Sequence, residues 1–185
     1  MAKIAVLVSG TGSNLEAILK YRLPVALVIS DRACPALDIA HKDNISVVIF
    51  DRQFGPEFNR DTFTTHILWH LRQYDIGLVA MAGFMTILSD FAFEWFPERI
   101  LNIHPSLLPK FKGAHAVRDA LASGEKVTGC TVHIATAQLD GGPILAQQEV
   151  SILDKDTVEV LHERIKIAER DLYPKTIAKY LREIS

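Results

Sequence analysis

The stretch IAVLVSGTGSNL, residues 4–15, decides the fold of this chain. Its first five residues are all apolar, which is typical of a strand in a parallel sheet that is covered on both faces. A turn with two glycines follows at residues 9–13, and residues 14–21 have the pattern of a helix. A strand, a tight turn and a helix in succession open a βα unit, so the stretch predicts an α/β fold.

The same alternation continues downstream. Further short apolar runs lie at residues 25–29, 47–50, 76–80 and 100–103. Segments of helical pattern separate the strands, at residues 14–21, 35–42, 56–74 and 89–96. Strands that alternate with helices predict a mostly parallel, twisted sheet with right-handed crossovers and with helices on both faces.

The pattern changes after residue 125. Residues 129–135 and 144–150 have the pattern of two strands around the turn LDGGP at 139–143, which predicts an antiparallel element in the C-terminal part. Residues 156–184 predict a long amphipathic helix that begins at a cap, Asp156 or Thr157, and that Pro174 bends or splits. Repeats and Gly/Ser/Pro-rich linkers are absent from the sequence, so we expect one domain over residues 1–185.

Composition and charge exclude several classes of protein. The 185 residues are 49% apolar and carry a formal net charge of −2, so they can build a full core and offer no strong positive field to nucleic acid or anionic membranes. Apolar runs fall short of the roughly 18 residues of a membrane span, and the first apolar run is too short for a signal peptide. Cys34 and Cys130 form no CxxC motif and suggest no disulfide framework. We therefore expect a cytoplasmic protein without nucleic-acid or membrane partners.

The turn at residues 9–13 is a candidate anion site. Free N–H groups and the positive end of the helix dipole meet at such a turn, and Ser13 and Asn14 add side-chain donors. A dinucleotide site would require glycine in place of Leu15, although Asp31 lies where a ribose-binding acid could follow the second strand. The loop also lacks the Gly-Lys-Ser/Thr of a Walker motif. A single terminal phosphate suits the Ser-Asn pair better, and the alternative is a purely structural turn with Ser13 as helix cap.

A second polar group follows the strand at residues 100–103. Asn102 and His104 share one face at its carboxyl end, which is where ligands bind in open α/β sheets. An amide beside an imidazole can stabilise an oxyanion. If the fold brings Asp140 next to His104, the carboxylate would favour the imidazolium form and could hold a water that relays protons. The alternative is that each is a structural polar group with a satisfied hydrogen bond.

The run NIHPSLLP at residues 102–109, with LDGG at 139–142, resembles the folate-dependent formyltransferase superfamily. The similarity is nearly end to end and favours the branch that formylates glycinamide ribonucleotide in purine biosynthesis. Further matches to that branch are residues 9–15, 82–85 and 87–88, and Glu169 ahead of Tyr173 and Pro174. The resemblance implies a Rossmann-like formyltransferase fold, 10-formyltetrahydrofolate as donor, glycinamide ribonucleotide as acceptor, no metal, and a monomer or homodimer.

The resemblance also implies roles for individual residues. The catalytic trio would be Asn102, His104 and Asp140, with Asn102 and His104 facing the oxyanion. The ribonucleotide would contact Gly12, Ser13, Asn14, Lys166 and Glu169. The folate would contact Arg60, Met85, Thr86, Ile87, Leu88, Asn102, Thr136, Ala137, Gln138, Leu139 and Asp140. Residues 1–100 would thus form a phosphate-binding half, and residues 101–185 a catalytic and folate-binding half.

One departure from the family pattern bears on the folate. Thr86 stands where relatives often have arginine, so a contact from that side chain is lost while backbone recognition of the pterin can survive. Two other activities stay open: hydrolysis of the same folate, and formyl transfer to another small phosphorylated amine. A non-catalytic folate- or nucleotide-binding regulator would require a damaged trio, and a nicotinamide-dependent oxidoreductase is disfavoured by Leu15.

Overall fold

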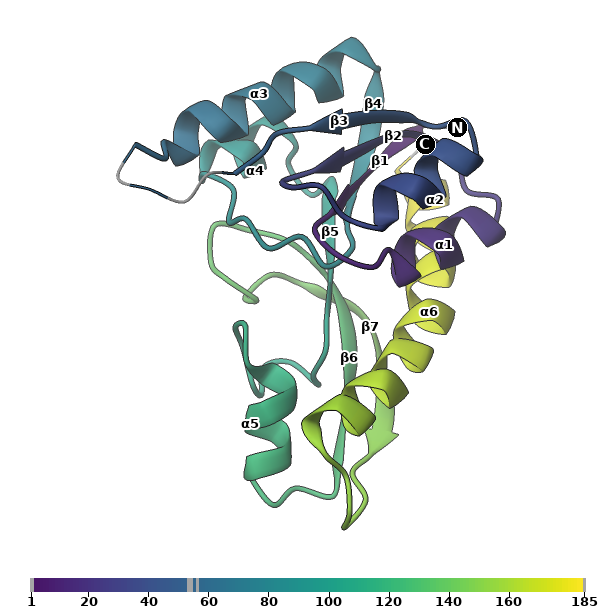
Figure 1. The fold of residues 1–185 in the computed structure, drawn as a ribbon, viewed down its shortest axis with the longest axis vertical. Coiled ribbons are helices and arrows are strands. Elements are labelled where there is room, and N and C mark those ends of the chain that lie inside the picture. Colours follow the sequence, from purple (N-terminus) through teal and green to yellow (C-terminus); the bar gives the residue numbers. More distant parts are fainter. Residues whose placement is uncertain (1, 53–54, 56, 185) are drawn as a thin grey trace.

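The computed structural model describes residues 2–52, 55 and 57–184 (Figure 1). Its strands are β1 (Lys3–Val8), β2 (Val25–Ser30), β3 (Ser46–Ile49), β4 (Ile76–Met81), β5 (Ile100–His104), β6 (Val127–Ile134) and β7 (Ile144–Ser151). Its helices are α1 (Ser13–Lys20), α2 (Ala36–Lys42), α3 (Arg60–Gln73), α4 (Phe91–Trp95), α5 (Ala116–Ala122) and α6 (Val158–Glu183).

The strands form one seven-stranded sheet in the order β3-β2-β1-β4-β5-β6-β7. All pairs from β3 to β5 are parallel, whereas β5 with β6 and β6 with β7 are antiparallel. The predicted fold class is therefore confirmed: a single, mostly parallel α/β domain with an antiparallel element in its C-terminal part.

The central strand β1 explains why its sequence is continuously apolar. Ile4, Val6 and Val8 point into a core cluster with α1, α2 and α6, while Ala5 and Leu7 point into a second cluster with α3 and α4. All five side chains are fully buried. Figure 1 shows α1, α2 and α6 on one side of the sheet and α3 on the other. Burial on both faces removes the apolar–polar alternation of a half-exposed strand.

The strand order reverses beside β1, and this reversal positions the site. From β1 the chain builds outward through β2 and β3, then returns by α3 to place β4 on the other flank of β1. Ligands bind at such a switch point, outside the carboxyl ends of the strands. The loops that leave β1 and β4 meet there, because the Met85 backbone N–H donates to Ser9 Oγ at 2.8 Å.

Two predicted helix boundaries need correction. The predicted helix over residues 56–74 begins later, at Arg60, because the side chain of Asn59 accepts a hydrogen bond from the Thr62 N–H and caps it there; Pro56 lies outside the described residues. Ser13 does not cap α1, since the cap position is taken by Gly12 in the left-handed conformation, without a side-chain hydrogen bond. Helix α5 is an element that the sequence patterns did not indicate.

The C-terminal helix α6 is not split by Pro174. It runs from Val158 to Glu183 with Pro174 inside, and the Thr157 hydroxyl accepts from the Val160 N–H at its start. A proline within a helix costs about 3 kcal/mol. Pro174 and the neighbouring Tyr173 are buried, and the Tyr173 hydroxyl contacts backbone carbonyls of both β4 and β5. We infer that this docking against the sheet offsets the cost of the proline.

Candidate active site

A cavity of about 530 Å³ lies at the carboxyl ends of β1, β4 and β5. Its wall contains the loop at residues 10–14, the segment 81–88 and the end of β5 at 102–105. The end of β6 and the loop after it contribute residues between 133 and 140, and α6 contributes His162, Lys166 and Glu169. Among the predicted site residues, only Arg60 and Gln138 are not in this wall. The fold thus gathers segments from distant parts of the sequence around one space.

The loop after β1 forms one end of the cavity. Gly12 has a φ of 81°, and a Cβ atom there would lie 2.8 Å from the Cα of Ala36, so the turn admits only glycine. Ser13 and Asn14 begin α1 and line the cavity beside its N-terminal N–H groups. This arrangement suits an anion such as a phosphate.

Helix α6 approaches the same end. The Asn14 side-chain N–H₂ donates to the Glu169 carboxylate at 3.0 Å. Glu169 is almost fully buried, and burial raises the pKa of its carboxyl group above the usual range. Lys166 also lines the cavity and pairs with Glu163 at 2.7 Å. A phosphate at the loop would therefore have a cationic side chain and a buried acid as neighbours.

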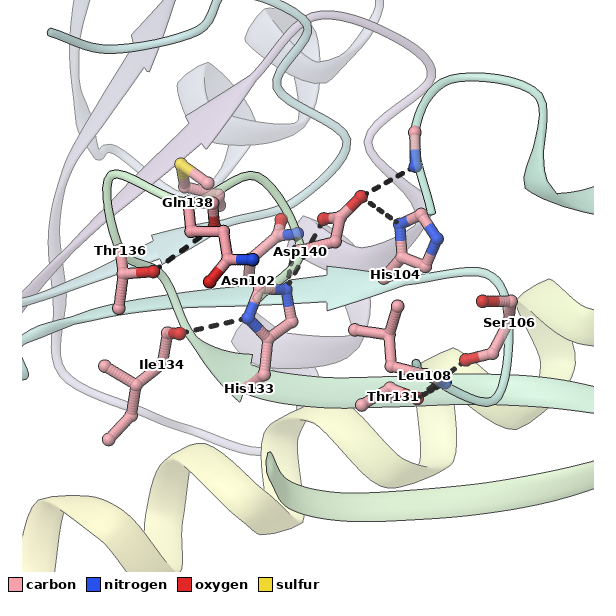
Figure 2. Close-up of polar contacts among 12 residues, drawn as sticks. Asn102, His104, Ser106, Leu108, Thr131, His133, Ile134, Thr136, Gln138 and Asp140 are labelled. Carbon is pink, nitrogen blue, oxygen red and sulfur yellow. Dashed lines mark hydrogen bonds and ion pairs between the residues drawn. The ribbon is translucent and has the colours of Figure 1, made fainter. Parts of the chain in front are cut away.

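The predicted catalytic trio comes together in the wall of the cavity (Figure 2). Asp140 Oδ2 lies 3.5 Å from His104 Nδ1 and accepts a hydrogen bond from the Gly113 N–H at 2.8 Å. His104 Nε2 lies 2.8 Å from the Phe111 carbonyl oxygen, which can only accept, so Nε2 carries a proton. Both ring nitrogens of His104 already have partners. This arrangement favours a role through the charge of His104 more than through an N–H aimed at an oxyanion.

Asp140 is held as a carboxylate. Burial by itself would raise its pKa, but the neighbouring His133 and His104 side chains and the hydrogen bond from the Gly113 N–H outweigh burial and lower the pKa below the usual value. The ionised Asp140 places a negative charge 3.5 Å from the His104 ring. The structure thus supplies the contact between carboxylate and imidazole that the sequence could only postulate.

The third member of the trio, Asn102, has a partner that sequence reasoning treated as structural. Asn102 Nδ2 lies 3.1 Å from Nε2 of His133. His133 Nε2 also lies 3.7 Å from Asp140 Oδ1. His133 is in β6, opposite Asn102 in the antiparallel β5–β6 pair. Figure 2 shows its ring with Nε2 directed toward both Asn102 and Asp140. A strand register of this kind leaves no motif in the sequence, so His133 could not be assigned to the site beforehand.

The segment at residues 85–88 also lines the cavity and is fixed by polar side chains. The Thr86 hydroxyl donates to the buried Asp31 carboxylate at 2.6 Å and accepts from an Arg52 N–H at 2.7 Å. Ser9 Oγ accepts from the Met85 N–H. Asp31 is therefore an internal anchor of this segment, and its burial and partners do not support the alternative of a ribose-binding acid. Met85 and Ile87 are more than half exposed and give this part of the wall an apolar edge.

Two residues predicted to contact the folate lie outside the cavity wall, and one residue of the wall was not predicted. Arg60 is exposed at the first position of α3, and Gln138 is exposed in the loop after β6; their predicted folate contacts stay predictions. His162 lines the cavity but was not singled out, although it lies one helical turn before Lys166. Burial lowers the pKa of His162, which favours a neutral ring.

Other kinds of site find little support in the described part of the chain. It contains no group of three or more His, Cys, Asp or Glu side chains arranged to hold a metal ion. None of its helices is both long enough and apolar enough to cross a membrane. Burial raises the pKa of the Cys130 thiol to about 12, so this thiol stays protonated. The cavity with the trio is therefore the best candidate for an active site.

Comparison with known proteins identifies the family. The family model described as formyl transferase matches residues 2–177. Phosphoribosylglycinamide formyltransferase of Mycobacterium tuberculosis is 45% identical over 182 residues, which are 96% of this chain and 84% of the relative. Glycinamide ribonucleotide transformylase 1 from Symbiobacterium toebii superposes with a TM-score of 0.90 at 44% identity, over 96% of this chain and 86% of that one. Phosphoribosylglycinamide formyltransferase from Streptococcus pneumoniae TIGR4 superposes with a TM-score of 0.91 at 34% identity, over 98% and 99%. The chain belongs to the formyl transferase family.

Proposed function

We propose that this chain transfers the formyl group of 10-formyltetrahydrofolate to the amine of glycinamide ribonucleotide in de novo purine biosynthesis. The products are N-formylglycinamide ribonucleotide and tetrahydrofolate. The observation that carries the proposal is that a single cavity contains an anion-binding loop, the trio of Asn102, His104 and Asp140, and the segments at 85–88 and 136–140. The names of the Mycobacterium tuberculosis and Symbiobacterium toebii relatives support the same reaction.

The cavity suggests how the two substrates lie. The ribonucleotide phosphate sits at Gly12, Ser13 and Asn14, where the N-terminus of α1 presents its N–H groups. The ribose and glycinamide extend along Lys166 and Glu169 toward the trio. The pterin enters from the opposite end, between residues 85–88 and 136–140. This placement brings the amine and the formyl carbon together next to Asn102 and Asp140.

The reaction then needs a hydrogen-bond donor for the oxyanion, a positive charge near it, and a path for the proton from the attacking amine to the leaving nitrogen. The amine nitrogen attacks the formyl carbon, and the carbonyl oxygen becomes an oxyanion. A side-chain N–H of Asn102 stabilises that oxygen, and one such donor is worth about 3–4 kcal/mol. The His104 imidazolium adds positive charge, and Asp140 stabilises that charge across 3.5 Å.

Collapse of the tetrahedral intermediate breaks the bond between the formyl carbon and the folate nitrogen. The proton lost by the attacking amine has to reach this leaving nitrogen. A water held by Asp140 would move it, because a buried carboxylate of lowered pKa accepts hydrogen bonds without keeping the proton. Binding both substrates in register contributes the remaining acceleration through proximity.

The test is an assay of the purified chain with both substrates that follows the release of tetrahydrofolate. We expect release that depends on glycinamide ribonucleotide, with one formylated acceptor formed for each tetrahydrofolate. Formate without a formylated acceptor would instead identify a formyltetrahydrofolate hydrolase. Release with a different phosphorylated amine, and none with glycinamide ribonucleotide, would keep the reaction type and change the acceptor.

A further inference from the structure

We propose that His133 is a positioning residue for the reaction, which fixes the orientation of the Asn102 side-chain amide. Its kinetic consequence rests on the proposed formyl transfer, whereas its structural part can be tested without turnover. The proposal stands on the contacts of the His133 ring, on its burial and on its place in the β5–β6 pair.

The first step is the protonation state of the His133 ring. Its Nδ1 lies 3.0 Å from the carbonyl oxygen of Ile134, and the ring is almost fully buried. A carbonyl oxygen can only accept, so Nδ1 carries the proton. In a neutral imidazole the other nitrogen, Nε2, is then a bare acceptor. The backbone of β6 therefore selects one tautomer of His133.

The second step is what this tautomer requires of Asn102. The Asn102 side chain lies 3.1 Å from the bare Nε2, so it must present its N–H₂ group there and not its oxygen. One N–H is used by His133, and the second N–H of the same nitrogen stays available to a ligand. Asn102 lines the cavity. His133 thus determines which end of the amide donates at the place where an oxyanion would form.

The third step concerns Asp140, the other neighbour of Nε2. Its Oδ1 is 3.7 Å away, beyond hydrogen-bond distance, while its Oδ2 is occupied by the Gly113 N–H and faces His104. The shorter contact is with Asn102. A second proton on His133 would reverse this: Nε2–H would turn into a donor toward Asp140, and Asn102 would lose its acceptor. The neutral ring is the state in which all these contacts are compatible.

The kinetic test uses two substitutions that differ only in whether an acceptor remains. His133→Leu removes both ring nitrogens, whereas His133→Gln can still accept from Asn102 through its side-chain oxygen. We expect kcat to fall about 10- to 100-fold in His133→Leu, since an unoriented donor loses much of the stabilisation that one oxyanion donor provides. KM for both substrates should change little. His133→Gln should recover most of the lost kcat. His41→Leu, on the exposed end of α2, is the matched control.

A purely structural histidine would behave differently. It would lower the melting temperature and would affect kcat and KM together, and His133→Gln would be no better than His133→Leu. Equal kcat values in these two variants would therefore overturn the proposal, as would an unchanged kcat in His133→Leu.

Nitrogen NMR of the ligand-free protein, labelled at histidine, provides the test that needs no turnover. We expect His133 Nε2 to show the chemical shift of an unprotonated, pyridine-type nitrogen and Nδ1 that of a protonated one. The opposite assignment, or a doubly protonated ring at neutral pH, would overturn the proposal. If the native chain failed to transfer formyl groups, the proposed function would fall, and the NMR assignment would still test the tautomer of His133 on which the orientation of Asn102 depends.

Discussion

Replacing Asp140 by asparagine should remove a charge from the site and little else. Asp140 has a φ of 48°, in the left-handed region, where asparagine is one of the few residues tolerated without strain. The amide oxygen of an asparagine can also still accept the hydrogen bond that the Gly113 N–H donates at 2.8 Å. We therefore expect the loop to keep its conformation and the melting temperature to change little, so that any loss of activity reports on the charge.

The size of the loss follows from the contact with His104. Two unit charges 3.5 Å apart interact by about 5 kcal/mol at an effective dielectric constant of about 20. Both side chains are more than nine-tenths buried, so screening by solvent is small. The amide dipole of asparagine still interacts favourably with a charge on His104 and replaces part of this energy. We therefore expect a net loss of about 3–4 kcal/mol of transition-state stabilisation. This corresponds to a fall in kcat of about 10²- to 10³-fold.

The assay is steady-state release of tetrahydrofolate with saturating substrates, together with thermal unfolding of each variant. Asp154→Asn is the matched control, because it makes the same chemical change at a surface residue that is paired with Lys126 at 3.2 Å and is almost fully exposed. We expect the control to match the wild type. An Asp140→Asn variant that folds normally and retains near-normal kcat would refute the electrostatic role assigned to Asp140.

Three further predictions follow from other contacts. Glu169→Gln removes a buried acid and should raise KM for glycinamide ribonucleotide roughly tenfold, about 1.4 kcal/mol, while KM for the folate stays constant when each substrate is varied in turn. Thr86→Val deprives the Asp31 carboxylate of a hydroxyl donor at 2.6 Å and should raise KM for 10-formyltetrahydrofolate roughly tenfold, since an unpaired buried group costs about 1–3 kcal/mol; an unchanged KM would contradict this. Hydrogen bonds from Arg164 lower the Asp156 pKa from 3.8 to about 2, so this residue stabilises the fold above pH 3.8 and loses that contribution as the pH falls through 2. Melting curves of Asp156→Asn should therefore lie below the wild type at pH 7 and converge with it between pH 3.8 and about 2; a constant difference would count against the ion pair.

The sequence predicts the strands well because their cause is local. A strand such as β1 that is buried on both faces has to be apolar at every position, and this can be recognised without knowing its neighbours. Helix limits depend on caps and packing. Asn59 starts α3 through one side-chain hydrogen bond, and α6 continues through Pro174 because the helix is anchored to the sheet. Neither the cap nor the anchor belongs to the hydrophobic periodicity that indicates a helix.

The candidate site also contains residues that local sequence can indicate and residues that depend on long-range packing. Asn102 and His104 could be selected because they share one strand end, and Asp140 because a glycine-rich turn is the kind of place where a functional carboxylate stands. The position of His133 depends on the register of β5 against β6, which is set by long-range pairing. Asp31 is the opposite case. Its place after β2 suggested a ribose contact, whereas in the structure its carboxylate accepts a hydrogen bond from the Thr86 hydroxyl. Residues that touch substrate can leave a motif, but residues that orient them are selected by geometry between distant segments, so they emerge only when the segments are assembled.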